Sequence, residues 1–264
     1  MPPITCIILA KNEAHRLPLV IAAAKTWAGE VIVACKPSTD GTEALVETCG
    51  AKLHRLPDSA QGMERGEEVT ATASNDWVLI LTAGEIPTPG LTRVIPQLVT
   101  EHGNDYDAFI LFFKYWSFGI HDTRSPWSWS GQIRLMNRKK VIFKNKVHDS
   151  FSTEQGRTGQ LDGAMREELH ILHQTHPTCA DFMRSHLDYM RAEAAAGPAE
   201  RLAGAKAQIA MMEKKEGVPE IHRYAWLTYW NGVALHCMEA LRADNVLGQY
   251  AERRLAYAQA LALT

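Results

Sequence analysis

Cysteine is scarce in this 264-residue sequence, and the five that are present never form a Cys-x-x-Cys pair. An odd, scattered set argues against both a thiolate metal centre and a framework of disulfides. Free thiols persist in reducing compartments, so we expect a cytoplasmic protein. The five positions are Cys6, Cys35, Cys49, Cys179 and Cys237.

Long apolar runs are missing as well, although 46% of the residues are hydrophobic. The longest runs fall far short of the ~18 consecutive apolar residues that a membrane-spanning helix needs. The opening Met-Pro-Pro leads into a strand pattern without the charged and long apolar segments of a signal peptide. We therefore expect any contact with a membrane to be peripheral and at its inner face.

Neither sign of charge dominates, because 28 Lys and Arg balance 30 Asp and Glu. A protein that binds nucleic acid needs a basic face, so we expect no nucleic-acid partner. The sequence also lacks a glycine-rich loop with a lysine near the first strand, which would hold a nucleoside triphosphate. This absence disfavours a nucleotidyltransferase.

The first hundred residues do contain an alternation of strand and helix patterns. Short apolar runs predict strands at 4–9, 30–33, 52–56 and 77–81, and helical patterns follow them at 14–26, 42–49, 60–74 and 89–100. Such alternation is typical of a parallel sheet with helices on both faces. We therefore predict an α/β fold in which a mostly parallel sheet is flanked by helices.

The pattern changes after residue 100. Further strands are predicted at 107–116, 132–136, 141–143 and 167–174, with a loop over 117–131. Helical patterns then cover 178–196, 198–215, 220–242 and 246–262, with Gly-Pro and Gly-Val-Pro breaks between the first three. We expect two domains, a sheet domain of residues 1–177 and a helical C-terminal extension of residues 178–264.

Polar loops follow three of the predicted strands. They are Lys11-Asn12-Glu13, Ser38-Thr39-Asp40-Gly41-Thr42 and Thr82-Ala83-Gly84-Glu85. Ligands of open parallel sheets bind at the carboxyl ends of the strands, where these loops lie. Backbone N–H groups and the Asp40 carboxylate would suit a ribose, a base edge or a phosphate. Taken alone, Asp40 is better explained as the cap of a helix, with Gly41 permitting the turn.

Three later segments complete a characteristic order, namely Gln132 to Arg138, Val147-His148-Asp149 and Leu172-His173. Together with the three loops, they resemble the family 2 glycosyltransferases of the GT-A fold, and most of all the branch of the lipopolysaccharide-core glucosyltransferases. The resemblance covers residues 4 to about 195. It implies an inverting glycosyltransferase of polysaccharide biosynthesis, whose donor is a UDP-linked nucleotide sugar. The acceptor would be a cell-envelope or surface glycan, free or lipid-linked.

The same resemblance assigns roles to single residues. Asp149 would be the general base that deprotonates the acceptor hydroxyl, with His148 as the alternative. The donor-binding positions are Ala10, Asn12, Glu13, Cys35, Asp40, Arg65, Thr82, Gly84 and Glu85. The acceptor side comprises Trp127, Trp129, Arg134 and His173. Aromatic faces stack on sugar rings, but the two tryptophans are equally well explained as core residues.

Three positions depart from the pattern of the family. An aspartate of the family stands where Cys35 is here, and its metal-binding Asp-x-Asp motif falls on Thr82-Ala83-Gly84. A divalent cation normally neutralises a diphosphate through carboxylate ligands, and Glu85 is at most one such ligand. Basic side chains can replace a metal, and the candidates are Arg65, Arg134, Arg138 and Lys140. Two functions stay open. One is a transferase that works without a metal, and the other is a non-catalytic GT-A-like protein that binds a nucleotide or sugar or acts as a scaffold.

Overall fold

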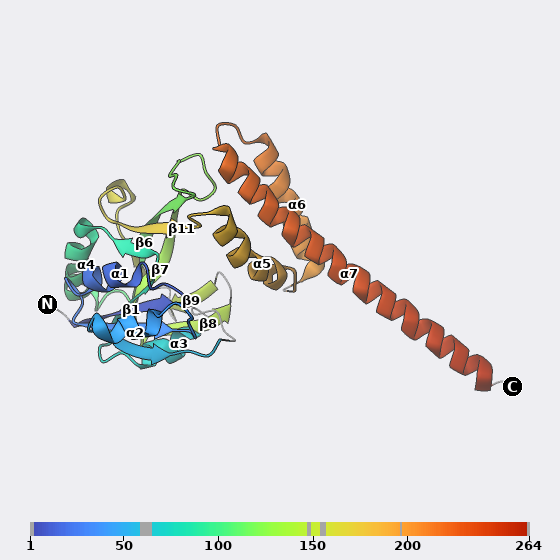
Figure 1. Ribbon diagram of the computed structural model, residues 1–264, viewed down its shortest axis with the longest axis horizontal. Helices are drawn as coiled ribbons and strands as arrows, with labels where there is room; N and C mark the ends of the chain where they lie inside the picture. Colours follow the sequence, from blue (N-terminus) through green and yellow to red (C-terminus); the bar gives the residue numbers. More distant parts are fainter. Residues whose placement is uncertain (1–2, 59–64, 147–148, 154–156, 196, 263–264) are drawn as a thin grey trace. The chain divides into compact units, whose positions relative to one another are not determined.

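The computed structural model of the protein describes residues 3–58, 65–146, 149–153, 157–195 and 197–262. The chain forms two compact units, one of residues 1–116 and 129–175 and the other of residues 117–128 and 176–264. The first unit holds the main sheet, and the second is mainly helical (Figure 1). We expected a domain boundary after residue 177, and the two units meet in the sequence between Thr175 and His176. Segment 117–128, which we expected in the sheet domain, belongs to the helical unit.

Within the described residues, the first unit is built on a nine-stranded sheet with the order β3-β2-β1-β4-β7-β6-β11-β5, and β10 pairs with β6. The strands are β1 (Ile4–Ala10), β2 (Glu30–Cys35), β3 (Lys52–Arg55), β4 (Trp77–Thr82), β5 (Glu85–Pro87), β6 (Ala108–Ser117), β7 (Trp129–Asn137), β10 (Thr158–Gln160) and β11 (His170–Thr175). Strands β3, β2, β1 and β4 are parallel, whereas β7 is antiparallel to β4 and to β6. A separate hairpin pairs β8 (Val141–Lys146) with β9 (Asp149–Thr153).

Helices cover both faces of the main sheet. They are α1 (Leu17–Ala24), α2 (Thr42–Thr48), α3 (Gly66–Ala71) and α4 (Pro89–His102), and a short 3-10 helix, η2 (Gly163–Met165), follows β10. Helices α1, α2 and α4 share one hydrophobic core with Ile8, and α3 shares the other with Ile7. Because β1 is buried on both faces, all of its residues except Thr5 are apolar. The predicted α/β fold class, a mostly parallel sheet flanked by helices and followed by a helical extension, is confirmed.

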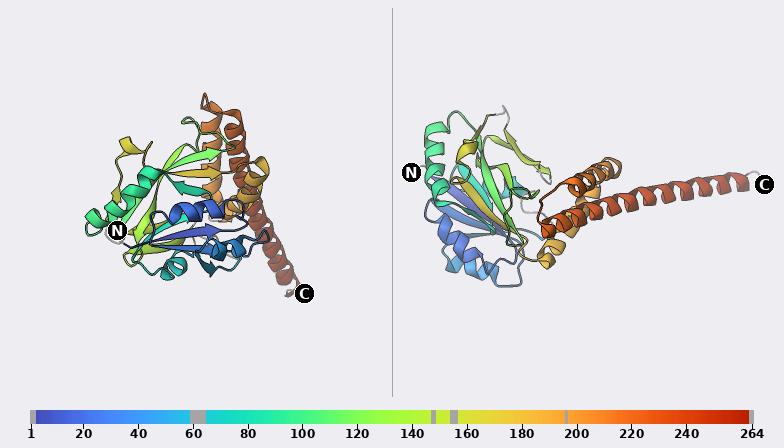
Figure 2. Two further views of the ribbon diagram at one scale, coloured as in Figure 1. Left: turned by 60° about the vertical axis from the view of Figure 1, so that its left-hand side comes forward. Right: turned by 90° about the horizontal axis from the view of Figure 1, so that it is seen from above.

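The second unit contains α5 (Cys179–Ala195), α6 (Pro198–Lys214) and α7 (Glu220–Ala262). Figure 2 shows α6 and α7 side by side, and α7 continues well beyond both other helices. The prediction of separate helices at 220–242 and 246–262 is wrong, because residues 243–245 contain no proline or glycine and the helix runs through them. Within the described chain, no helix combines the length and the hydrophobicity needed to cross a membrane.

Candidate functional site

The carboxyl ends of β1, β2 and β4 meet at one edge of the sheet. In the parallel ladders Ala10 lies opposite Cys35, and Leu9 lies opposite Thr82. The three polar loops therefore leave the sheet at the same edge. The side chains of Ala10 and Cys35 are buried, so at this edge they can offer a ligand only backbone groups. The Cys35 thiol donates to the carbonyl of Lys36 at 3.2 Å, and burial raises its pKa.

Asn12 fastens the loop after β1 to the loop after β2. Its side-chain carbonyl accepts a hydrogen bond from the N–H of Thr39 at 2.8 Å, and its own N–H donates to the Ser38 hydroxyl at 3.1 Å. Asn12 has a φ of 55°, a left-handed conformation that asparagine adopts more readily than most residues. Asn12 therefore shapes this edge by holding the two loops together.

Asp40 joins the same two loops through its carboxylate. The carboxylate accepts hydrogen bonds from the Ala14 N–H at 2.9 Å and from the N–H and hydroxyl of Thr42 at 3.0 and 2.5 Å. Desolvation opposes ionisation, but these hydrogen bonds outweigh it and hold the pKa of Asp40 below its usual range. Gly41, with a φ of 85°, is the cap of α2. Asp40 is thus an ionised carboxylate that connects two loops and does more than cap a helix.

Glu13 is held by an arginine that the sequence patterns did not single out. Arg16 Nε and Nη2 donate to the two carboxylate oxygens of Glu13 at 2.7 Å each, which makes a two-point ion pair. Arg16 Nη1 donates to the carbonyl of Gln174 at 3.3 Å and so connects the start of α1 with the end of β11. A lone arginine ahead of a helix carries no sequence signal that could have revealed these contacts.

Glu85 forms the centre of a buried cluster. It is fully buried, and its Oε2 accepts a hydrogen bond from the N–H of Thr82 at 2.7 Å. Its Oε1 lies 3.1 Å from Arg134 Nη2 and 3.3 Å from His173 Nδ1. Burial lowers the pKa of His173; Glu85 opposes this effect, and the charges of Arg134 and Arg16 reinforce it. The structure thus brings predicted donor-side Glu85 together with predicted acceptor-side Arg134 and His173.

Two polar residues to which the sequence assigned no role, Gln132 and Tyr115, complete this cluster. Gln132 Oε1 accepts from Arg134 Nε and Nη2 at 3.2 and 3.0 Å, and Gln132 Nε2 donates to the Tyr115 hydroxyl at 2.8 Å. The Arg134 guanidinium lies 4.9 Å from the ring centroid of Phe113. Gln132 and Arg134, like Phe113 and Tyr115, are two residues apart on a strand and so share a face. This spacing of two residues is the sequence signal that could have placed Gln132 beside Arg134 and Tyr115 beside Phe113.

The two predicted acceptor tryptophans fall in different units. In the sheet unit, the ring of Trp129 lies 5.1 Å from Lys114 Nζ and 5.1 Å from the Arg166 guanidinium. In the helical unit, the ring of Trp127 lies 6.0 Å from that of Phe182. Trp127 thus lies beside an aromatic ring and Trp129 beside two cations, and the acceptor roles of both tryptophans stay predictions.

Three other predicted residues have no shown role. Arg65, expected at the diphosphate, forms an ion pair with Glu68 at the start of α3. His148 lies outside the described residues. Asp149 begins β9, where its backbone pairs with Lys146 across the hairpin. The general-base roles of Asp149 and His148 stay predictions.

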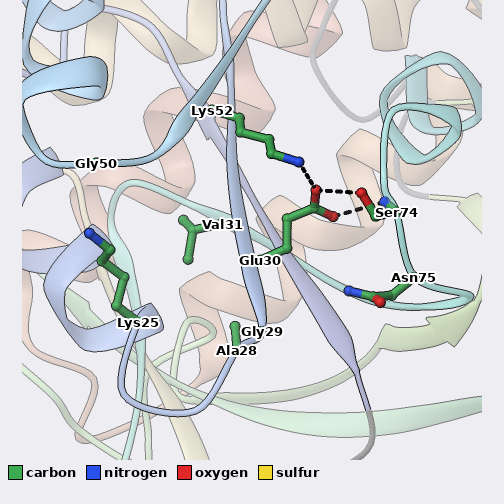
Figure 3. A pocket seen from close by; sticks show the side chains of 9 residues that line it. All are labelled: Lys25, Ala28, Gly29, Glu30, Val31, Gly50, Lys52, Ser74 and Asn75. Atoms are coloured by element: carbon green, nitrogen blue, oxygen red, sulfur yellow. Dashed lines mark hydrogen bonds and ion pairs between the residues drawn. The ribbon is translucent and has the colours of Figure 1, made fainter.

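A cavity of about 470 Å³ lies at the opposite edge of the sheet, where β2 and β3 begin (Figure 3). In it, the Glu30 carboxylate accepts hydrogen bonds from Lys52 Nζ at 2.5 Å and from the N–H and hydroxyl of Ser74 at 2.8 Å each. Arg138 donates to the carbonyl of Asn75, which lines this cavity. This basic residue, a candidate for replacing a metal, therefore contacts the edge opposite the polar loops. Because ligands of such sheets bind at the carboxyl ends, we assign no donor site here.

No family model matches the sequence. A protein of Rickettsia felis named an uncharacterised glycosyltransferase is 31% identical over 156 residues, which are 57% of this chain and 54% of the relative. A protein of Rickettsia typhi with the same description is also 31% identical, over 57% of this chain and 53% of the relative. This chain thus spans about half the length of the curated relatives it matches.

Two solved structures are also similar to the chain. One is described only as a mycobacterial protein, with a TM-score of 0.42 and 14% identity over 66% of this chain and 65% of that one. The other is glucosyl-3-phosphoglycerate synthase from Mycobacterium tuberculosis with Mn²⁺, UDP and phosphoglyceric acid, at a TM-score of 0.38 and 17% identity. That match covers 52% of this chain and 56% of the synthase. The similarity of this chain to proteins named glycosyltransferases therefore rests on the curated relatives with 31% identity.

Proposed function

We propose that this chain is an inverting glycosyltransferase of family 2, in the branch of the lipopolysaccharide-core glucosyltransferases. Its donor is a UDP-linked sugar, and its acceptor is a glycan or lipid-linked glycan of the cell envelope, reached from the cytoplasmic side. The observation that carries this proposal is the bracing of two loops by Asn12 and Asp40 at the carboxyl edge of the parallel strands. Such a rigid polar edge is where sheets of this kind bind nucleotides. The name shared by the curated relatives points to the same chemistry.

The transfer step needs a base and a stabilised leaving group. An acceptor hydroxyl attacks the anomeric carbon while Asp149 takes its proton. The new glycosidic bond forms on the face opposite the departing nucleoside diphosphate, so the configuration inverts. The bond between the anomeric carbon and the diphosphate oxygen breaks, and its electron pair leaves with the diphosphate. General-base catalysis of this kind contributes about 10²- to 10⁴-fold to the rate.

Asp149→Asn tests this assignment. Purified protein is supplied with a panel of nucleotide sugars and envelope glycans, and sugar transfer and nucleotide binding are both measured. We expect the substitution to lower the transfer rate at least about 100-fold, because the base is lost, and to leave nucleotide affinity unchanged. Asp76→Asn is the control, since Asp76 pairs with Lys139 on the surface. Transfer by Asp149→Asn at the native rate would exclude Asp149 as the base.

The departures at Cys35, Thr82 and Gly84 favour one alternative, a non-catalytic protein that binds a nucleotide or sugar or acts as a scaffold. The same panel separates the two functions. Turnover of any donor by the native protein excludes this alternative, whereas nucleotide binding without turnover of any donor supports it.

A further inference from the structure

The resemblance to metal-dependent transferases would place a divalent cation beside Thr82 and Gly84, and the structure tests whether these residues fit one. A Cβ built on Gly84 lies 2.9 Å from the backbone carbonyl oxygen of Gln174, so an aspartate has no room there. Glu85 is fully buried and paired with Arg134. Among the described residues, no three His, Cys, Asp or Glu side chains are grouped to bind a metal ion. The residues of this turn do not fit a divalent cation.

Arg16 lies beside Gly84, the position of the second aspartate in an Asp-x-Asp motif. The Cβ built on Gly84 is 3.1 Å from Arg16 Nη1. The Gly84 carbonyl accepts a hydrogen bond from the Gln174 N–H at 3.0 Å, and Arg16 Nη1 donates to the Gln174 carbonyl at 3.3 Å. The backbone of Gln174 in β11 therefore hydrogen-bonds both to the Arg16 guanidinium and to the turn between β4 and β5.

Arg16 is fixed in place and still accessible. Its two-point pair with Glu13 sets the plane of the guanidinium, while 25% of the Arg16 side chain remains exposed. A guanidinium has five N–H donors, and its contacts with Glu13 and Gln174 engage three of them. The charges of Arg16 and Glu13 sum to zero. The charges of a divalent cation and the two carboxylates that hold it also sum to zero, and such a cation still binds a diphosphate. Pairing with Glu13 is therefore no obstacle to binding an anion.

We propose that Arg16, oriented by Glu13, binds the diphosphate of the nucleotide sugar in place of a divalent cation. This inference rests on the proposed function, because it requires a nucleotide-sugar donor. A guanidinium supplies a permanent positive charge and paired N–H donors that match phosphate oxygens. Negative charge grows on the nucleoside diphosphate as its bond to the sugar breaks, and a fixed cation at that position stabilises it. Glu13 is a positioning residue in this arrangement.

Calorimetric titration of the full chain tests the inference. UDP, GDP, dTDP and ADP, each alongside its monophosphate, are titrated first in EDTA and then with Mn²⁺. We expect one diphosphate to bind more tightly than its monophosphate and with the same affinity in EDTA and in Mn²⁺. Arg16→Ala should weaken that diphosphate about 10- to 100-fold, the loss expected for charge-assisted hydrogen bonds, and leave the monophosphate unchanged.

Matched variants separate this role from a structural one. Arg55→Ala removes another arginine paired with a glutamate, Glu43 at 2.9 Å, and should leave diphosphate affinity at the native value. Glu13→Gln should weaken diphosphate binding less than Arg16→Ala does, because the charge of Arg16 remains. Arg16→Lys, which keeps the charge without the paired donors, should show an intermediate loss and replaces Arg16→Ala if thermal unfolding shows that variant to be misfolded.

The outcomes distinguish this inference from the proposed function. Diphosphate binding that requires Mn²⁺, or native-like diphosphate affinity in the Arg16 variants, overturns the role of Arg16 and leaves the glycosyltransferase proposal standing. Absence of any nucleotide binding by folded native protein overturns both.

Discussion

Among single residues, Glu30 shows how one carboxylate couples stability to pH. Its side chain is only 7% exposed. Desolvation opposes its ionisation, but hydrogen bonds from Lys52, Thr5 and Ser74 prevail and lower its pKa from 4.5 to about 2. Because the pKa is lower in the folded state, the stabilisation is complete above pH 4.5 and is lost as the pH falls from about 4.5 to about 2.

Glu30→Gln should therefore flatten the dependence of unfolding free energy on pH between about 4.5 and about 2. At neutral pH the variant should be about 1–3 kcal/mol less stable, because charge-assisted hydrogen bonds are lost in a buried place. Urea denaturation at a series of pH values measures both effects. Glu101→Gln, at an exposed position of α4, should keep the native profile. A native-like acid profile in Glu30→Gln would contradict this account.

At this scale the sequence predicted which residues lie at the carboxyl edge better than what they contact. Asn12, Glu13 and Asp40 lie where the strand pattern places them, because the ends of parallel strands are set by hydrophobic runs. Their partners are set by folding: Arg16 and Gln174 are 158 positions apart in the sequence and still share a hydrogen bond. No local pattern encodes such a contact.

Among elements, the strands buried on both faces were the most predictable. The expected strands at 30–33 and 77–81 correspond to β2 (Glu30–Cys35) and β4 (Trp77–Thr82). The three-residue strand β5 was missed, because it is too short for a hydrophobic period and is defined by its pairing with β11. Strand β7 begins at Trp129, inside the loop expected over 117–131, because its first residues pair with β6. Pairing between distant segments defines both elements.

The junction of β4, β5 and β11 depends on the absence of a side chain at Gly84. We expect Gly84→Ala to lower the free energy of unfolding by about 1–3 kcal/mol, because the added Cβ would press on the backbone of β11. Gly204→Ala in α6 is the matched control, since a Cβ there meets no atom within 4 Å. Its helical site should make the control variant more stable by up to about 1 kcal/mol. Urea denaturation of both variants measures the difference, and equal effects would rule out the close approach at Gly84.

At the scale of the whole molecule, the helical unit is assembled from two separate parts of the chain. Segment 117–128 leaves the sheet unit between β6 and β7 and belongs to the helical unit. There the ring of Phe118 lies 5.9 Å from that of Phe182 and 6.0 Å from that of His222. Trp127 contacts the same two rings. Truncation alone therefore cannot separate the two units cleanly.

A chain ending at residue 175 should consequently expose the aromatic side chains of segment 117–128, bind a hydrophobic dye and self-associate, because large exposed apolar patches promote association. Replacing 117–128 by a short Gly-Ser linker in that chain should remove both the dye binding and the self-association. A chain ending at residue 242 keeps the partners of Phe118 and Trp127, so it should behave as the full chain does. Dye fluorescence and size-exclusion chromatography distinguish these results. A monomeric, dye-free chain ending at 175 with its native 117–128 segment would show that this segment does not depend on the helices.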